Sequence, residues 1–195
     1  MKTVFVAVVA ALGGRAAFGA KLQSLFEAPS DKKSAAGTFT GDVTGLIGQY
    51  AHGNEPSHHA AYFFRWSDRP WMTDEIVRRV FDTQYSPRPD GLCGNDDCGQ
   101  MAAWYIFSAL GFYPFDPCGG EYVIGAPQVP KATLHCTPTP NTYASFTMTA
   151  RNLSKENKYV KSATLNGKPI TDWKLRHADI MSGGELVFEM SSKPQ

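Results

Sequence analysis

Two short polar loops carry the residues of this chain whose types and spacing could support chemistry. The first, HGNEPSHH, begins at residue 52 and places Asn54 and Glu55 directly before a proline, with His58 and His59 just after it. Glu55 is a candidate general acid or base, or an oxygen ligand for a hard cation, and Asn54 is a candidate ligand through its amide oxygen. The structural alternative is that Asn54 or Ser57 caps the next helix while the Glu55 carboxylate interacts favourably with the positive end of that helix.

The second loop, CGNDDCGQ, begins at residue 93 and places two adjacent acids, Asp96 and Asp97, ahead of an aromatic-rich stretch. Two neighbouring carboxylates repel each other unless a cation or a hydrogen-bond donor compensates. Calcium would serve, because it accepts several oxygen ligands at flexible angles. The alternative is again capping, in which one acid accepts hydrogen bonds from the first free N–H groups of a helix.

Metal sites built on softer ligands are less well supported. His58 and His59 are adjacent, so they do not have the spacing that puts two zinc ligands on one helical face. Cys93 and Cys98 are separated by four residues, a wider spacing than zinc or redox pairs usually have. A disulfide that pins the acidic loop and a pair of free thiols both remain open.

Taken together, the two loops have the same construction, since each is acidic and each opens an apolar, aromatic helix. A cleft that cleaves sugars needs acids around the scissile bond and aromatic rings beneath the pyranose. The residues alone therefore indicate, without establishing, a carbohydrate-cleaving site.

Helical periodicity dominates the first part of the chain. Residues 1–27 have apolar side chains at helical spacing, interrupted near Gly13 and Gly14, which predicts a helix or a pair of helices. Pro56 predicts the first turn of a helix that starts just after Glu55.

Two more helices are expected before the pattern changes. Thr73 is a predicted N-cap, followed by acids in the first turn, and a further helix is predicted from about Gly99 to Leu110. Beyond about residue 115 the period becomes that of strands, with a hairpin turn predicted at Asn166–Gly167. The chain is therefore predicted to be α+β, with a helical part at 1–115 and a β-rich part at 116–195.

Composition narrows the class of partner. The chain has 195 residues, of which 43% are hydrophobic and 19% charged, and a formal net charge of +1 without long blocks of Lys or Arg. These values are typical of a globular protein and argue against nucleic acid or a membrane as a partner. The apolar run at the N-terminus is too short to span a bilayer, and it is interpreted as part of a helix and not as a convincing signal peptide.

Longer stretches around the two loops resemble a known enzyme family. GLIGQYAHGNEPSHHAAYFF, QYSPRPDGLCGNDDCGQMAAWYIFSALGFYP and GEYVIGAP are similar to glycoside hydrolase family 92, the calcium-dependent exo-acting α-mannosidases. The likeness continues through NLSKENKYVKSATLNGKPI and IMSGGELVFEM, so it covers nearly the whole chain.

The resemblance implies an inverting mechanism, in which an acid protonates the leaving oxygen and a carboxylate base activates water. In the family pattern the base is the second acid of the acidic run, which is Asp97 here, with Asp96 beside it as the second candidate catalytic residue. Asn54 and Glu55 are expected on the calcium side of the site, and Glu55, His58 and His59 are expected to contact the substrate. The implied cofactor is Ca²⁺ and the implied substrate is a glycan with terminal α-mannosides, as in N-glycan processing.

The resemblance also implies an architecture larger than this chain. Members of the family have an N-terminal β-sandwich ahead of an (α/α)6 barrel, and this chain resembles the closing barrel helices followed by a small antiparallel β region. The proton-donating glutamate of the family is expected upstream, in an N-terminal half that would be a partner of this chain. The parent enzyme is expected to be secreted or luminal, and the isolated chain is expected not to turn over substrate by itself. The alternative hypotheses are a non-catalytic module that binds calcium and mannosides and a structural α+β domain.

Overall fold

The computed structural model describes residues 2–30, 43–116 and 118–195. Its first two helices are α1 (Lys2–Ala11) and α2 (Arg15–Glu27), and they meet at Gly13 and Gly14, whose φ angles are 92° and 90°. This confirms the predicted break, because glycine adopts such left-handed angles without steric cost. A buried face of α2, spaced at one helical turn, packs on the rest of the helical part through Phe18, Leu22 and Phe26.

The first polar loop is held between a short hairpin and a tight helix. Strands β1 (Leu46–Ile47) and β2 (Tyr50–Ala51) pair antiparallel, and η1 (Glu55–Trp66) follows as a 3₁₀ helix with a proline in its first turn. The predicted helix is therefore present, but it starts one residue earlier than expected. A 3₁₀ helix of 12 residues is long for its kind, since such helices usually end after three or four residues.

Helices α3 (Met72–Gln84) and α4 (Gln100–Ala109) complete the helical part. The predicted bounds of α4 are confirmed to within a residue at each end, but the predicted N-cap of α3 is wrong. Thr73 lies inside the helix, fully buried, and its hydroxyl has no hydrogen-bond partner in the described part of the chain. The two acids predicted for the first turn, Asp74 and Glu75, do lie there, and the Asp74 carboxylate also pairs with the Arg65 guanidinium.

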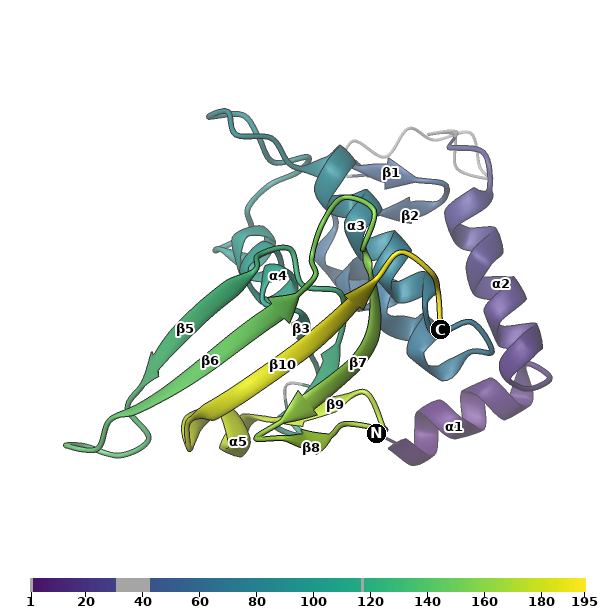
Figure 1. Ribbon diagram of the computed structural model, residues 1–195. Coiled ribbons are helices and arrows are strands. Elements are labelled where there is room, and N and C mark those ends of the chain that lie inside the picture. Colours follow the sequence, from purple (N-terminus) through teal and green to yellow (C-terminus); the bar gives the residue numbers. More distant parts are fainter. Residues whose placement is uncertain (1, 31–42, 117) are drawn as a thin grey trace.

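The β-rich part contains two sheets. Strands β3 (Phe112–Asp116), β4 (Glu121–Ile124) and β9 (Lys174–Arg176) form an antiparallel sheet in that order. The larger sheet has the order β5-β6-β10-β7-β8, with β10 between β6 and β7 (Figure 1). The bounds of its strands are β5 (Lys131–Cys136), β6 (Ala144–Arg151), β7 (Tyr159–Leu165), β8 (Lys168–Pro169) and β10 (Gly184–Ser191).

The chain is α+β, as predicted, but the expected antiparallel β region is wrong for one strand pair. Strand β10 runs parallel to β6 and antiparallel to β7. The cause is topological, since β6 and β7 are consecutive in sequence yet β10 enters between them after β8, β9 and the short helix α5 (His177–Met181). The hairpin at Asn166–Gly167 is confirmed, with both residues at positive φ.

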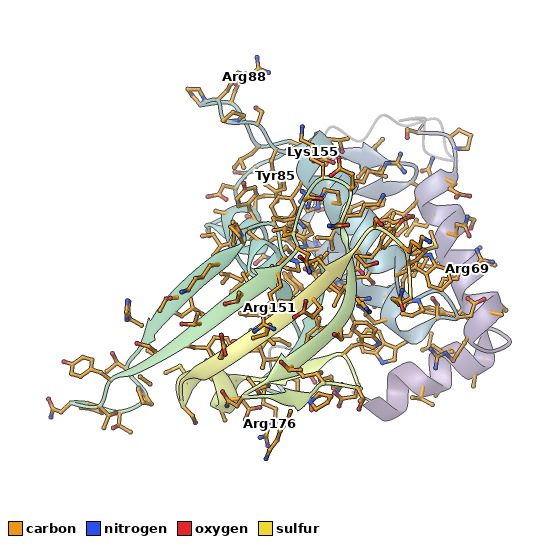
Figure 2. All side chains as sticks on the ribbon, viewed as in Figure 1. Arg69, Tyr85, Arg88, Arg151, Lys155 and Arg176 are labelled. Atoms are coloured by element: carbon orange, nitrogen blue, oxygen red, sulfur yellow. The ribbon has the colours of Figure 1, made fainter. Side chains whose placement is uncertain are left out.

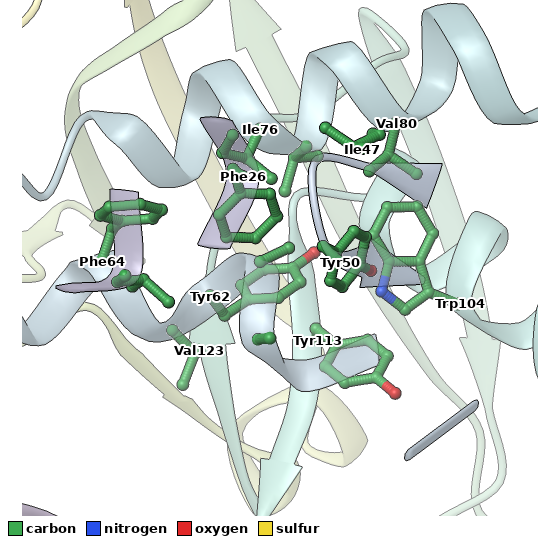
Figure 3. Packing of buried hydrophobic residues seen from close by; sticks show 14 of the residues in the cluster. Phe26, Ile47, Tyr50, Tyr62, Phe64, Ile76, Val80, Trp104, Tyr113 and Val123 are labelled. Carbon is green, nitrogen blue, oxygen red and sulfur yellow. The ribbon is translucent and has the colours of Figure 1, made fainter. Parts of the chain in front are cut away.

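Two clusters of buried side chains form the core. One lies among the helices and β1–β2 (Figure 3), where Trp104, Tyr50, Tyr62 and Phe64 are almost completely buried. The other lies under the larger sheet, and Phe107 of α4 packs against both clusters. The separation of 1–115 and 116–195 into distinct domains stays a prediction.

A buried ion pair fastens the helical part to both sheets. Arg65 of η1 donates to the Ile124 carbonyl of β4 at 2.8 Å and to Asp74 of α3, and its guanidinium carbon lies 4.0 Å from the centre of the Trp173 ring. The other Asp74 oxygen accepts the Val160 N–H of β7 at 3.0 Å. The helices that carry the polar loops are thus fixed to the β-rich part by buried, fully paired charges.

None of the helices in the described ranges combines the length and the hydropathy that crossing a membrane requires.

Candidate functional site

The two polar loops singled out in the sequence meet in space. Together with Thr44 they line a cavity of about 430 Å³, to which the first loop contributes Asn54 and Glu55 and the second contributes Asn95 and Asp97. Carboxylate, amide and hydroxyl oxygens from three segments therefore converge on one hollow.

Glycines allow this close approach. A methyl group added to Gly94 would lie 2.7 Å from both the Cα and the carbonyl oxygen of Gly53, so even alanine at this position would separate the loops. Gly53 in turn is held by its N–H, which donates to the Thr44 carbonyl at 3.1 Å as the hairpin ladder continues past β2.

Asp96 and Asp97 have different surroundings. Asp96 caps α4, because its Oδ1 accepts the Ala102 N–H at 2.9 Å and its backbone carbonyl accepts the Met101 N–H at 3.1 Å. Asp97 is exposed and lines the cavity. The capping alternative therefore describes Asp96 and leaves the carboxylate of Asp97 available for chemistry, while a catalytic role for either acid stays a prediction.

The backbone that presents Asp97 is strained. Asp97, Cys98 and Gly99 follow one another at φ angles of 51°, 57° and 92°. Two consecutive non-glycine residues in the left-handed region are unusual, since each costs about 1–2 kcal/mol relative to the right-handed region. Such strain tends to persist at functional sites, where the surrounding structure holds it in place.

At the other side of the cavity, Asn54 and Glu55 stand at the start of η1. Asn54 occupies the N-cap position, but its side chain makes no capping hydrogen bond, and Glu55 is exposed. The capping alternative is therefore wrong for the Asn54 side chain. Glu55 lies at the positive end of the helix, which favours a carboxylate. This position is compatible with a role as a general acid or base and with a role as an oxygen ligand for a cation.

His58 lies away from solvent, with an exposure of 1%. Its Nε2 is 2.9 Å from the carbonyl oxygen of His52, so this nitrogen carries the proton, and Nδ1 accepts a hydrogen bond from the Gln100 amide at 3.1 Å. Burial lowers its pKa, which keeps the ring neutral. His58 thus joins η1 to α4 within the protein, and its direct contact with substrate stays a prediction.

His59 lines a different cavity, of about 330 Å³, next to Gln100 of α4 and aromatic rings of α4 and β3. Its ring makes edge contacts with Phe63 and Phe115, at centroid distances of 5.0 and 6.0 Å. The structure therefore assigns the two adjacent histidines to different surroundings, which agrees with their failure to share a helical face.

A residue that the sequence reasoning did not single out is His52. It is fully buried, with Nδ1 2.7 Å from the Tyr50 hydroxyl and Nε2 2.7 Å from the Tyr85 hydroxyl, and Tyr85 donates onward to the Met101 carbonyl at 3.2 Å. Burial, with a smaller contribution from the neighbouring His58, lowers the His52 pKa to about 3. The local sequence gave no signal of this network, because Tyr85 lies 33 residues from His52 in the sequence.

The donor set of the first cavity fits a hard cation. Its side-chain donors are oxygens of two carboxylates, two amides and one hydroxyl, the ligand types that calcium prefers. No group of three or more His, Cys, Asp or Glu residues suited to a metal occurs in the ranges that the structure describes, so a cation bound here would complete its shell with amide oxygens, water or substrate hydroxyls. All four cysteines are thiols, and burial raises the pKa of Cys93 to about 11.

Comparison with known proteins identifies the family. Residues 5–192 match the model of the glycosyl hydrolase family 92 catalytic domain. Over 145 residues the chain is 30% identical to an uncharacterized secreted glycosidase of Arthroderma benhamiae, which covers 72% of this chain and 18% of that protein.

Solved structures of the same family are also similar to this chain. The α-mannosidase BT3965 of Bacteroides thetaiotaomicron, in complex with mannoimidazole, is 41% identical with a TM-score of 0.79, covering 92% of this chain and 23% of that one. The inverting mannosidase BT2199 of the same species is 36% identical with a TM-score of 0.76, covering 95% and 25%. The chain spans about a quarter or less of the length of these relatives. Since the family model matches almost the whole chain, this protein belongs to glycosyl hydrolase family 92.

Proposed function

We propose that this chain forms part of the active site of a calcium-dependent α-mannosidase that removes terminal α-mannose from glycans with inversion at the anomeric carbon. One observation carries the proposal most directly. Asp97, Glu55 and Asn54, which come from two separate loops, line a single cavity, whereas Asp96 is occupied in capping α4. Mannose-active relatives such as the one in complex with mannoimidazole support the choice of sugar.

In this proposal Asp97 is the base. It accepts a proton from water as that water attacks the anomeric carbon, and its exposed position on the cavity wall leaves it free to do so. Inverting enzymes keep the acid and the base about 6.5–9.5 Å apart to leave room for this water. The proton donor is assigned to sequence outside this chain, which spans 23% of the BT3965 structure.

Calcium is proposed to bind among the oxygens of the same cavity, with Asn54 and Glu55 as its ligands from this chain. When bound, it would supply a positive charge that holds and polarises sugar hydroxyls. Glu55 would then bind the cation and also contact the substrate. Without the cation, the carboxylates of Glu55 and Asp97 would repel anionic ligands from the cavity.

The helices are proposed to be the closing helices of an (α/α)6 barrel, and the parent protein is proposed to be secreted or luminal. The similarity to a secreted fungal glycosidase supports the location. Terminal mannose on N-glycans is the substrate that fits such a location.

A substrate that needs no protonation of its leaving group tests the assignment of the base. Fluoride departs from α-D-mannosyl fluoride without an acid, so the purified chain should release mannose from it in the presence of calcium, and NMR should show the β-anomer first. Chelator and Asp97→Asn should each abolish the release. Asp90→Asn, in an exposed loop acid paired with Arg88, is the matched control and should leave it unchanged.

Other results would change the conclusion. Initial release of the α-anomer, or release that survives Asp97→Asn, would refute the inverting role of Asp97. Calcium binding measured by calorimetry, lost in Glu55→Gln, with no release of mannose would favour the alternative of a binding module. Absence of both binding and release from a folded chain would remove both functions.

A further inference from the structure

The second cavity is lined by both aromatic and polar side chains. Its volume is about 330 Å³, its aromatic walls are Phe107, Tyr113 and Phe115, and its polar groups are His59, Gln100 and the Tyr113 hydroxyl. We propose that this cavity is a subsite for a neutral hexopyranose ring, distinct from the cavity that contains Asp97. The choice of mannose as the sugar rests on the proposed function.

The aromatic walls are held rigidly. Tyr113 stacks on Tyr62 with a centroid distance of 5.2 Å and an interplanar angle of 17°, and Phe115 contacts Trp66 at 4.8 Å and Phe63 at 5.5 Å. Rings that are fixed before binding lose little entropy when a ligand packs against them. The apolar faces of a pyranose pack against such rings, as they do in sugar sites generally.

The buried His58 fixes the direction of the Gln100 amide. His58 donates from Nε2 to the His52 carbonyl, so its Nδ1 is an acceptor and requires a donor. Gln100 must therefore present Nε2, which lies 3.1 Å from Nδ1 of His58 and 3.2 Å from the Tyr113 oxygen. The Gln100 oxygen then points away from His58 as an acceptor.

This arrangement leaves unsatisfied hydrogen-bonding groups around the cavity. Tyr113 accepts from Gln100, so its own O–H proton is available, and neither the Gln100 Oε1 nor the ring nitrogens of His59 have a hydrogen-bond partner among the residues that the structure describes. Burial lowers the pKa of His59, so this ring is neutral and offers one donor and one acceptor. Paired donors and acceptors are what the hydroxyls of a sugar require.

Charge excludes other ligand classes. The lining of this cavity contains no carboxylate, amine or guanidinium group in the described ranges, so it has no counter-ion for a phosphate, an amine or an acidic sugar. Gln100 opens α4 three residues after Asp97, and both cavities therefore border the start of the same helix.

Ring-resolved NMR of the whole chain tests the proposal. Methyl α-D-mannopyranoside is titrated into protein treated with chelator, and the side-chain signals of His59 and Tyr113 should shift saturably. Tyr113→Phe keeps the wall and removes one hydroxyl, so it should weaken the dissociation constant about 2- to 10-fold, the value of one net hydrogen bond. Tyr122→Phe is the matched control, since it removes an exposed hydroxyl that pairs with His177, and it should have no effect.

The failure of this proposal can be told from failure of the proposed function. Asp97→Asn should abolish calcium-dependent release from mannosyl fluoride while leaving the sugar-induced shifts at His59 in place. Saturable binding that leaves His59 and Tyr113 unperturbed, or binding that Tyr113→Phe does not weaken, would overturn the subsite. So would the absence of binding at the highest soluble sugar concentration.

Discussion

Removing the charge of Asp74 should destabilise the whole fold, because Asp74 is the counter-ion of Arg65 in the buried ion pair that joins the helices to the sheets. This pair and its hydrogen bonds to Ile124 and Val160 are called the hub below. Asp74 and Arg65 are each about 1% exposed. In Asp74→Asn the guanidinium keeps its hydrogen bonds to Ile124 and Pro70 but loses its counter-ion in a site that water does not reach. Breaking a buried pair in this way typically costs about 3–5 kcal/mol.

The expected effect on melting follows from the size of the chain. For a protein of this length each kcal/mol shifts the midpoint by about 2–4 °C, so Asp74→Asn should lower it by about 6–20 °C. Circular dichroism during thermal and urea unfolding gives both the midpoint and the free energy. The matched control is Glu189→Gln, which removes the carboxylate that pairs with the exposed Arg151 (Figure 2 labels Arg151) and should cost no more than about 1 kcal/mol.

The stabilities of Asp74→Asn and Glu189→Gln can contradict this role of the ion pair. If Asp74→Asn lost less than about 1 kcal/mol, the guanidinium would have found water or another acceptor, and the hub would not be what fixes the two parts together. A loss of the folded state with both variants would point instead to a chain that tolerates no change.

Three further predictions concern the site. The folded chain should lose about 1.4 kcal/mol of stability per pH unit as the pH falls from about 6.5 towards 3. The reason is that His52 has a pKa of about 3 in the folded state, so the unfolded state binds a proton first. Urea unfolding across this pH range measures the loss. Asp96→Ala should cost about 0.5–2 kcal/mol through loss of its cap on α4, whereas Asp97→Asn should leave stability nearly unchanged, as unfolding curves of the two variants will show. Gly94→Ala should separate the two loops and weaken calcium binding in calorimetry, because its methyl group would meet the backbone of Gly53 at 2.7 Å.

Each of these three predictions has a control variant or a result that would contradict it. For the pH effect, His52→Gln should remove about one proton from the slope, while exchange of the exposed His177 should not; an unchanged slope in His52→Gln would contradict the assignment. Equal stability of Asp96→Ala and the parent chain would show that the cap contributes nothing. Calcium affinity unaffected by Gly94→Ala would mean that the cation binds elsewhere.

Local patterns predicted the helices well because their causes are local. The break at Gly13 and Gly14, the end of α4 and the turn at Asn166–Gly167 each follow from backbone preferences of the residues themselves. The N-cap expected at Thr73 is wrong because α3 already begins at Met72, with Trp71 at the N-cap position, so Thr73 lies inside the helix and is buried.

The order of the larger sheet could not be predicted from local patterns. Strand β10 lies between β6 and β7 and pairs parallel with β6, although β8, β9 and α5 separate it from β7 in the sequence. Alternation predicts which side chains face the core, as the buried Phe146, Met148 and Ala150 of β6 illustrate. It carries no information on which strand lies alongside.

The candidate site shows what a sequence can and cannot say about two adjacent acids. From the residues alone, Asp96 and Asp97 were equivalent, and either of them suited a cap or a catalytic base. They differ in the structure because the backbone becomes left-handed at Asp97: the Asp96 carboxylate accepts a hydrogen bond from the first turn of α4, while Asp97 starts the run of positive φ angles and lines the cavity. A strained turn therefore separates a structural carboxylate from one that is free for chemistry. The same turn ends at Gly99, directly before Gln100. The backbone that exposes Asp97 therefore also sets the position of Gln100, which lines the second cavity.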